Sequence, residues 1–551
     1  TQNESFAAGT QASAVANQAV AFGANANASG NYSLAVGSNS QASGDNAQAF
    51  GDRAVASGQS SFSAGAESQA TKANSVAIGT GASSTNISTL ALGSIASSSG
   101  YQSTAIGFNA NASAKDSVAL GAQSFANAAN TIAFGTSSLA TAQGAMAFGL
   151  NSQASAVDSI AIGFNSLANK DNSSAIGSSA KATGLRSIAF GQQATVSGKD
   201  SIAIGYLSNA VDRDSLAIGT RSDSAGNEAF AFGTRAVASG ERSTAIATNA
   251  SSVGVNSVAF GVNAAAEGFN SFAFGTGAKA CGNNAFAFGI DAVALGDDSF
   301  AFGDGARTSS SANDSLATGD KALALGADSS AYGVEATALD FDRAFAYGTA
   351  STSAATDASA FGTNSSATMT NSTAFGTDSL SRGENSMAFG LKSKVGTKSP
   401  NSSAYGVTAY VKGTNAYAMG TNSSSNGVNV SAFGSDSRSV GVNTRAQGVN
   451  AFADGVNVTA IGTDSTAIGN NTRAQGVNAF ADGVNVMAIG TDSTAIGNNT
   501  RAQGVNAYAF GQNVTATGTN AYSNGLNALA QGVDATADGQ NVSAFGTDAT
   551  A

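Results

Sequence analysis

The sequence predicts an all-β protein: a parallel β-solenoid of about 39 coils, with fourteen residues in each coil. Three observations predict this class. A glycine recurs every fourteen residues, the residues before it alternate between small and large, and only 11% of the 551 residues are charged. Low charge with abundant small polar residues is also typical of disorder, but the strict phase of the repeat favours an ordered fold.

The glycine series begins at Gly9 and continues at a spacing of 14 to Gly303, with Ala247 as the one exception. The spacing lengthens at three places between Gly303 and Gly406 and is 14 again from there to Gly546. These changes divide the chain into regular repeats at 1–303, repeats with insertions at 304–434 and a modified repeat at 435–551.

Each repeat is expected to form two short strands joined by tight turns. The segment Ser75-Val76-Ala77-Ile78-Gly79 alternates with a period of two, as a strand does. The spacing does not fit a helical period of about 3.6, and each Gly would weaken a helix by about 1 kcal/mol. Two short strands cannot bury a face alone, so successive coils must stack about 4.8 Å apart.

The large side chains are expected to fill the coil. Val76 and Ile78 would point inward and meet small residues such as Ala82 on the facing strand. Aromatic residues recur at the same two positions in the middle of the chain and should stack as a ladder in the core: Phe272, Phe274, Phe286, Phe288, Phe300 and Phe302.

The residue between the two large ones is almost always Ala. We expect it to point outward, where its constancy would require another copy of the chain packed against it. The alternative is recent duplication, since residues 443–470 recur at 471–498 with one change, Thr459 to Met487. The candidate interface residues are Ala77, Ala105, Ala161, Ala203, Ala259 and Ala287.

The effective period becomes 28 in residues 435–551. Arginine now occurs where Val stood in earlier repeats, at Arg445, Arg473 and Arg501. A buried unpaired Arg is very costly, so these side chains must face water or pair with carboxylates such as those of Asp454 and Asp482. A possible amide ladder comprises Gln447, Gln475, Gln503 and Gln531.

The composition argues against several functions. Without His, the commonest general base and metal ligand is missing. A net charge of −11 leaves no basic stripe for nucleic acid. We therefore expect no enzyme and no cofactor, metal or nucleic-acid site. Cys281 is interpreted as an inert small residue, or alternatively as a cross-link between identical copies.

No apolar run reaches the length of about 18 residues that a membrane-spanning helix needs. No charged-then-apolar signal segment opens the sequence. We expect export from a longer precursor.

Three segments, residues 74–79, 158–163 and 256–261, resemble the head repeats of the YadA-like trimeric autotransporter adhesins. The resemblance covers nearly the whole chain. It implies a left-handed parallel β-roll, a homotrimeric rod and a location on the bacterial cell surface, anchored at the outer membrane by a region outside this sequence.

Collagen binding in this family is associated with Asn-Ser-Val-Ala-Ile-Gly, two free positions and Ser. Residues 74–79 match the first six places, but Ala82 stands where Ser is expected. Residues 371–379 and 385–393 keep the final Ser. The ligand candidates implied by the resemblance are Asn74, Ser75, Val76, Ala77, Ile78, Gly79, Asn371, Ser372, Ser379, Asn385, Ser386 and Ser393.

The sequence favours an adhesin head that attaches a cell to extracellular matrix, host cells, surfaces or other bacteria. Weak contacts repeated along such a coil would gain strength through avidity. The alternative is a subunit of a self-assembling extracellular filament, because the exposed strands of an uncapped coil invite end-to-end pairing.

Overall fold

The computed structural model confirms the all-β parallel solenoid. It describes residues 4–339, 341–450, 452–457, 459–461, 463–475, 477–478, 480, 482–485, 487–489, 491–492, 494–506 and 508–550. These residues contain 73 strands and no helix, which corresponds to about 37 turns rather than 39. The difference lies near the C-terminus, where several repeats pair only through isolated bridges. The chain forms two compact units, Thr1–Asn270 and Ser271–Ala551.

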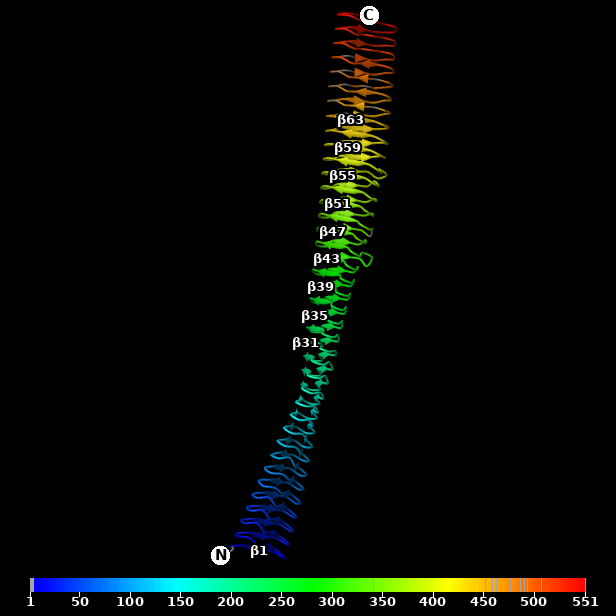
Figure 1. The fold of residues 1–551 in the computed structure, drawn as a ribbon. Helices are drawn as coiled ribbons and strands as arrows, with labels where there is room; N and C mark the ends of the chain where they lie inside the picture. The colour runs from blue at the N-terminus through cyan, green and yellow to red at the C-terminus, as the bar shows by residue number, and fades with distance from the viewer. Residues whose placement is uncertain are drawn as a thin grey trace. The chain divides into compact units, whose positions relative to one another are not determined.

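In the first unit every turn contributes one strand of three residues and one of two. The odd-numbered strands run from β1 (Phe6–Ala8) to β37 (Val258–Phe260) in steps of fourteen residues. The even-numbered strands run from β2 (Ser13–Ala14) to β38 (Ala265–Ala266) in the same steps. We call the two stacks the long-strand sheet and the short-strand sheet (Figure 1).

In the second unit the long-strand sheet comprises β39 (Phe272–Phe274), β41 (Phe286–Phe288), β43 (Phe300–Phe302), β45 (Leu316–Thr318), β47 (Ser330–Tyr332), β49 (Phe345–Tyr347), β51 (Ser359–Phe361), β53 (Thr373–Phe375), β55 (Met387–Phe389), β57 (Ser403–Tyr405), β59 (Tyr417–Met419), β61 (Ser431–Phe433), β63 (Arg445–Gln447), β65 (Thr459–Ala460), β67 (Arg473–Ala474), β68 (Met487–Ala488) and β70 (Arg501–Ala502).

The short-strand sheet of this unit comprises β40 (Lys279–Ala280), β42 (Val293–Ala294), β44 (Arg307–Thr308), β46 (Leu323–Ala324), β48 (Thr337–Ala338), β50 (Thr352–Ser353), β52 (Ser366–Ala367), β54 (Leu380–Ser381), β56 (Lys394–Val395), β58 (Tyr410–Lys412), β60 (Ser424–Asn426), β62 (Arg438–Val440), β64 (Phe452–Ala453) and β66 (Thr466–Ala467). A separate four-stranded sheet follows, with β69 (Thr494–Ala495), β71 (Tyr508–Ala509), β72 (Tyr522–Ser523) and β73 (Thr536–Ala537).

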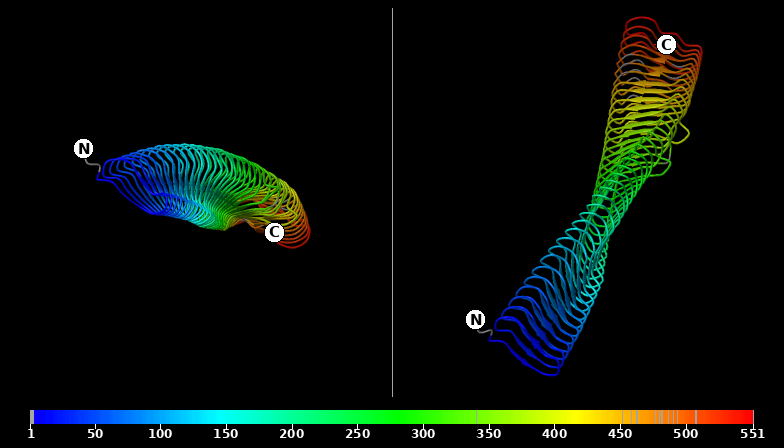
Figure 2. Two further views of the ribbon diagram at one scale, coloured as in Figure 1. Left: turned by 90° about the horizontal axis from the view of Figure 1, so that it is seen from below. Right: turned by 60° about the horizontal axis from the view of Figure 1, so that its bottom comes forward.

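Each strand pairs in parallel with its equivalent in the next turn, so equivalent residues form columns. Between β11 (Val76–Ile78) and β13 (Leu90–Leu92), Ala77 lies opposite Ala91. Parallel pairing between neighbouring repeats satisfies the backbone of strands that are too short to be stable alone. Figure 2 shows the successive turns of each unit as loops of similar outline.

The recurrent glycine ends each long strand, and it is required by the close approach of the next turn. Gly79 has a φ of +129°, and a Cβ at this position would lie 2.5 Å from the carbonyl of Gly93. Such a φ is costly for any residue with a side chain. Ala247 occupies the equivalent position with a φ of +104°.

In the part of the chain that the structure describes, the interior of the coil holds only small side chains. Ser75, Ala77, Ala82 and Ser84 all point inward and are completely buried. Among the described residues, the largest side chains buried to this degree are valines and threonines, such as Val196 and Thr131. The two sheets of the coil are therefore too close together to enclose Ile or Phe.

The expected packing of the large residues was therefore wrong. Val76 and Ile78 point outward and are half-buried, while Ile162 is 39% exposed and Phe274 is 45% exposed. The alternation along the strand was correct, but its two faces were exchanged. Val76, Ile78 and Ala82 were expected to meet inside the coil, but only Ala82 lies there.

Many interior hydroxyl groups bond to the nearby backbone or to one another, although those of Ser33, Ser243 and Ser379 have no partner within the described part of the protein. The Oγ of Ser103 donates to the carbonyl of Gly100 at 2.8 Å. The Oγ atoms of Ser103 and Ser98 also lie 2.7 Å apart across the coil. Where such contacts form, Ser replaces Ala inside the coil without leaving an unpaired polar group.

The insertions between Gly303 and Gly406 bulge from the turns without breaking the columns. Phe300 pairs with Leu316 across one insertion, and Met387 pairs with Ser403 across another. Figure 1 shows the bulging loops near β43 and β55. None of the described segments is a helix with the length and apolar character needed to span a membrane.

Candidate functional site

The outward face of the long-strand sheet is mainly apolar in the first unit, and in the second unit from β39 to β61. In these turns one or two large apolar side chains flank the small buried residue at the centre of the strand. Phe190 and Phe232 are 51% and 47% exposed in the first unit, and Phe302 is 53% exposed in the second. We call this surface the apolar face. Soluble monomers rarely expose apolar patches beyond a few hundred Å², so this surface is the principal candidate for an interface.

Stacked aromatic rings run along the apolar face of the second unit. The ring centroids of Phe272 and Phe286 lie 4.6 Å apart, and those of Phe274 and Phe288 lie 4.9 Å apart. The next turn adds Phe300 at 5.6 Å and Phe302 at 4.8 Å. The expected ladder is thus present, but it lies on the surface rather than in the core.

The alanines proposed as interface residues lie inside the coil of a single chain. Each is at most 1% exposed: Ala77, Ala105, Ala161, Ala203, Ala259 and Ala287. Their constancy reflects the narrow interior and needs no neighbouring copy. Their large neighbours supply the exposed surface instead. The signal that could have identified this arrangement is the absence of any residue larger than Val from the columns of small residues.

The motif residues divide into a buried and an exposed set. Ser75, Ser372, Ser379 and Ser393 are completely buried, and Ser386 is 3% exposed. No ligand outside the coil can reach these hydroxyl groups. Gly79 lies at the turn described above.

The asparagines of the motif occupy left-handed turn positions at the surface. Asn74, Asn371 and Asn385 have φ values of +56°, +55° and +53°. Asn371 Nδ2 donates to Asn385 Oδ1 at 2.9 Å, which links two successive turns. Ligand contact by these asparagines, or by the outward Val76 and Ile78, stays a prediction.

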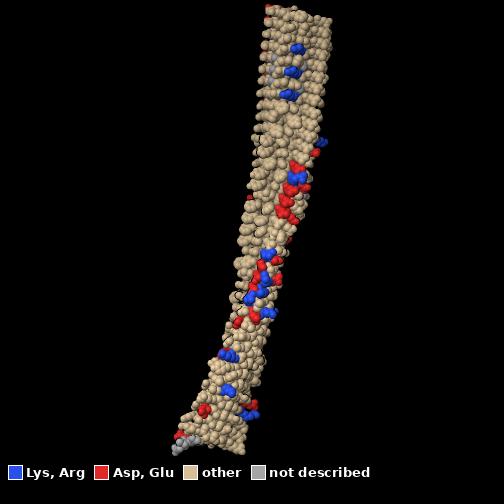
Figure 3. Space-filling model, viewed as in Figure 1, with Lys and Arg blue, Asp and Glu red and all other residues tan. Residues whose placement is uncertain are grey.

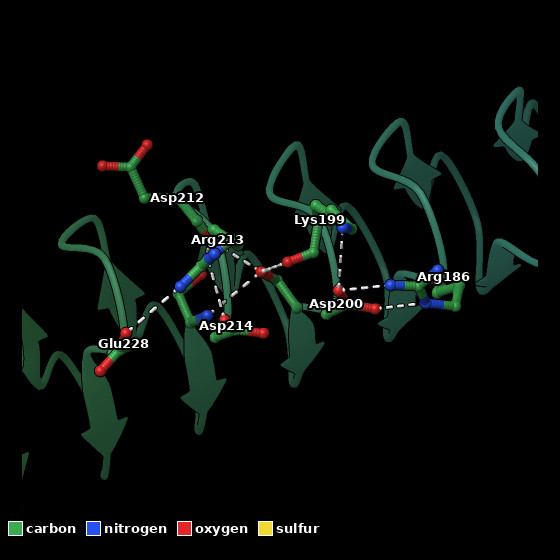
Figure 4. Close-up of polar contacts among 9 residues, drawn as sticks. Arg186, Lys199, Asp200, Asp212, Arg213, Asp214 and Glu228 are labelled. Carbon is green, nitrogen blue, oxygen red and sulfur yellow. Dashed lines mark hydrogen bonds and ion pairs between the residues drawn. The ribbon is translucent and has the colours of Figure 1, made fainter.

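Charged side chains gather in separate bands on the face shown in Figure 3, with uncharged surface between them. One such band joins successive turns of the first unit (Figure 4). Arg186 makes two hydrogen bonds to Asp200, at 2.5 and 2.7 Å. Further along, Arg213 lies 3.0 Å from Asp214 and 3.3 Å from Glu228.

The hydrogen bonds from Arg186 are the main reason that the pKa of Asp200 is lowered from its ordinary value. A hydrogen bond from Arg343 has the same effect on the pKa of Asp357 in the second unit. All four side chains are substantially exposed. Since exposed ion pairs contribute little free energy, these pairs are best explained as links between turns.

The arginines of the 28-residue repeat lie on the outward face of the long-strand sheet. Arg445 donates to Gln447 Oε1 at 2.6 Å. Arg473 bonds to Gln475 and Arg501 to Gln503 in the same way. The expectation that these side chains avoid the core is confirmed.

Among the described residues, neither the alternative of pairing with carboxylates nor the possible glutamine ladder is found in this section. Asp454 directly follows β64, which belongs to the short-strand sheet. Arg445 belongs to the long-strand sheet. Gln447 and Gln475 are two turns apart and bond to arginines, so they build no amide ladder. The amide ladder of this section instead consists of turn asparagines, with contacts of 3.0–3.2 Å along Asn457, Asn471, Asn485, Asn499, Asn513 and Asn527.

No curated protein sequence matches the chain significantly. The family described as "YadA head domain repeat (2 copies)" matches it at residues 1–26, 28–54, 42–61, 56–82, 84–110, 112–138, 140–166, 168–194, 197–222, 224–246, 252–278, 280–306, 317–339, 367–393, 412–437, 440–465, 460–485, 488–521 and 523–549. The longest unmatched stretches are 307–316, 340–366 and 394–411. Repeat spacing, fold and family match agree: the chain belongs to the YadA head family, whose repeats build the heads of trimeric autotransporter adhesins.

Proposed function

We propose that this chain forms the adhesive head of a homotrimeric surface protein that attaches a bacterium to extracellular matrix, host cells, other surfaces or other bacteria. The observation that carries the proposal is the apolar face. Association of identical chains through this face would remove its large side chains from water, at about 25 cal/mol per Å² of apolar surface buried. The number of three copies is proposed from the family.

Sedimentation equilibrium of the full chain tests the assembly. We expect a particle of three times the 53.5 kDa mass of one chain. Phe190→Asp combined with Phe288→Asp should dissociate it, because both side chains lie on the apolar face and are 51% and 41% exposed. The matched control is Phe125→Asp, since Phe125 is 36% exposed on the short-strand sheet.

A monomeric wild-type chain would contradict the proposal. An open-ended polymer would favour the self-assembling filament. If the control dissociated the particle as effectively as the double variant, the loss of assembly would not be specific to the apolar face, and this would also contradict the proposal.

The ligand proposed from the family resemblance is a matrix protein such as collagen, contacted by exposed motif asparagines. A solid-phase assay with immobilised collagen should show weaker binding by the variant Asn371→Ala/Asn385→Ala. The control is Asn415→Ala/Asn429→Ala, which removes an equivalent hydrogen-bonded pair, 3.2 Å apart, outside the motif. Equal binding by the wild type and both variants would exclude the motif as the contact.

A further inference from the structure

The chain has a hollow where one of the insertions widens a turn. Residues 397–400 form a loop between β56 and β57, and the hollow beside it has a volume of about 350 Å³. Its lining includes Arg382, Lys398 and Glu384. The remaining lining residues are Met369, Ser399, Pro400 and Thr414. The volume lies at the lower end of the range for small-molecule sites, about 300–1,000 Å³.

The hollow lies where this chain departs from its family. Residues 394–411, which include the loop, fall outside every match to the family repeat. The chain is closely packed where the loop begins, because a Cβ at Gly396 would lie 3.2 Å from the carbonyl oxygen of Val411 and 3.6 Å from the Tyr410 hydroxyl. The general repeat therefore does not create this site; the inserted loop does.

Basic side chains surround the hollow in an otherwise acidic protein. Residues 378–412 contain five basic and two acidic residues, whereas the whole chain has a net charge of −11. Arg382, Lys394 and Lys412 are exposed on three successive turns of the short-strand sheet. None of the three, nor Lys398, forms an ion pair with any described carboxylate. These cations can therefore bind an external anion without breaking an existing pair.

We propose that this hollow binds an acidic sugar within a glycan chain. Arg382 and Lys398 would bind its sulfate or carboxylate group. The Glu384 carboxylate would accept hydrogen bonds from sugar hydroxyls, and Met369 and Pro400 would contact the apolar face of the ring. The inference deepens the proposed adhesive function, and rests on it, by naming a class of ligand.

The surroundings favour a short acidic glycan over nucleic acid. The basic patch covers about three turns, or roughly 14 Å at 4.8 Å per turn. The negative charge of the rest of the chain would repel a long polyanion. A carboxylate inside the hollow also disfavours a ligand that offers phosphates alone.

Calorimetric titration of the full chain tests the proposal with three probes: a heparin hexasaccharide, a galacturonate hexasaccharide and inorganic sulfate. We expect one site per chain for a hexasaccharide and much weaker binding of sulfate. The heparin and galacturonate arms distinguish a sulfated from a carboxylated sugar, and binding of either one supports the site.

The variant Arg382→Gln/Lys398→Gln should weaken hexasaccharide binding about tenfold, from the loss of two exposed charge contacts. The matched control Lys181→Gln/Lys279→Gln removes two exposed, unpaired charges from other short strands and should change the affinity less than about twofold. Glu384→Gln should weaken binding of the sugar while strengthening binding of sulfate.

Binding of neither hexasaccharide would overturn the proposal, as would equal losses in the variant and the control. Sulfate that bound as tightly as the sugars would show a simple anion site and would also overturn it. Sedimentation of the same samples reports trimer formation separately, so failure of the assembly and failure of this site are distinguishable.

Discussion

Alanine is fixed at the centre of each long strand by the space inside a single coil. Ala161 is completely buried between the two sheets, whereas its neighbours Ile160 and Ile162 point outward. Ser63 shows that one more heavy atom is tolerated at the equivalent position, where it lies 2.7 Å from Ser68. The volume of a side chain therefore restricts which residues fit at an inward position more strongly than its polarity does.

The first prediction concerns this limit. Ala161→Leu should lower the free energy of unfolding by about 1–3 kcal/mol or more, because the interior cannot expand without separating the sheets. Ala161→Ser is the control and should change it by much less. Thermal unfolding followed by circular dichroism checks both, and equal midpoints for the two variants would contradict the narrow interior.

The second prediction concerns the turn after each long strand. Gly79→Ala should destabilise the chain by about 1–3 kcal/mol, because the residue adopts a φ that disfavours side chains and its Cβ would overlap Gly93. Gly81→Asn should be tolerated. Its φ of +67° suits Asn, and the nearest atom to its Cβ would be a side-chain carbon of Ile95 at 3.9 Å. Denaturant unfolding of the two variants would separate these effects.

At the level of strands and turns, ion pairs between side chains also join successive turns of the coil. The pair Arg186–Asp200 lowers the pKa of the Asp200 carboxyl. A depressed folded pKa means that the stabilisation is complete above the unfolded value of about 3.9 and is lost as the pH falls through the folded pKa.

Asp200→Asn should therefore lower the unfolding temperature slightly at neutral pH and have a progressively smaller effect as the pH falls below about 3.9. Asp212→Asn is the matched control, because the Asp212 side chain points away from these ion pairs in Figure 4. Calorimetric scans across this pH range measure both variants. A difference that did not decrease as the pH fell would have another origin.

Much of the structure at the level of strands and turns could be predicted from the sequence. The two strands per turn, the in-register columns and the turn glycines all follow from the spacing and the alternation. The direction of the alternation could not be predicted from one strand alone, because a period of two fixes two faces without naming them. The Ala77 column contains small residues and the Ile78 column contains large ones. This difference shows which column points inward only when the width of the closed coil is known.

The site was predicted less completely than the fold. Asn371 and Asn385 lie at the surface as a ligand contact requires, but Ser379 and Ser393 face the interior. The hollow beside Pro400 depends on how an inserted loop bends away from its turn. No spacing rule specifies that conformation.

At the scale of the whole molecule, adhesion is proposed to combine an apolar face that holds copies together with outer surfaces that remain available to ligands. The short-strand sheet carries most of its outward residues as Ser, Thr, Asn and charged side chains, although Phe125 and Tyr410 are exposed there as well. Repetition of weak contacts along such a surface increases the overall strength of attachment.

The modular columns yield a further prediction. Residues 443–470 and 471–498 are copies that differ at one position, and each supplies two turns. Deleting 443–470 should leave the remaining columns in register and change the unfolding temperature little, because each repeat contacts only its neighbours. Deleting 443–463 instead removes one and a half turns and should unfold this region. Circular dichroism and limited proteolysis would distinguish the two deletions.

The parallel hydrogen bonds between turns have a mechanical consequence. Within a unit they run along the direction of stacking, so tension in that direction acts on successive turns in series. Peeling off one turn of fourteen residues converts about 4.8 Å of stack into an extended tether of roughly 46–50 Å. Optical-tweezer extension of one chain should therefore show repeated small releases rather than a single rupture. A chain that lengthens in such increments dissipates the energy of a sudden pull through the successive rupture of hydrogen bonds between turns.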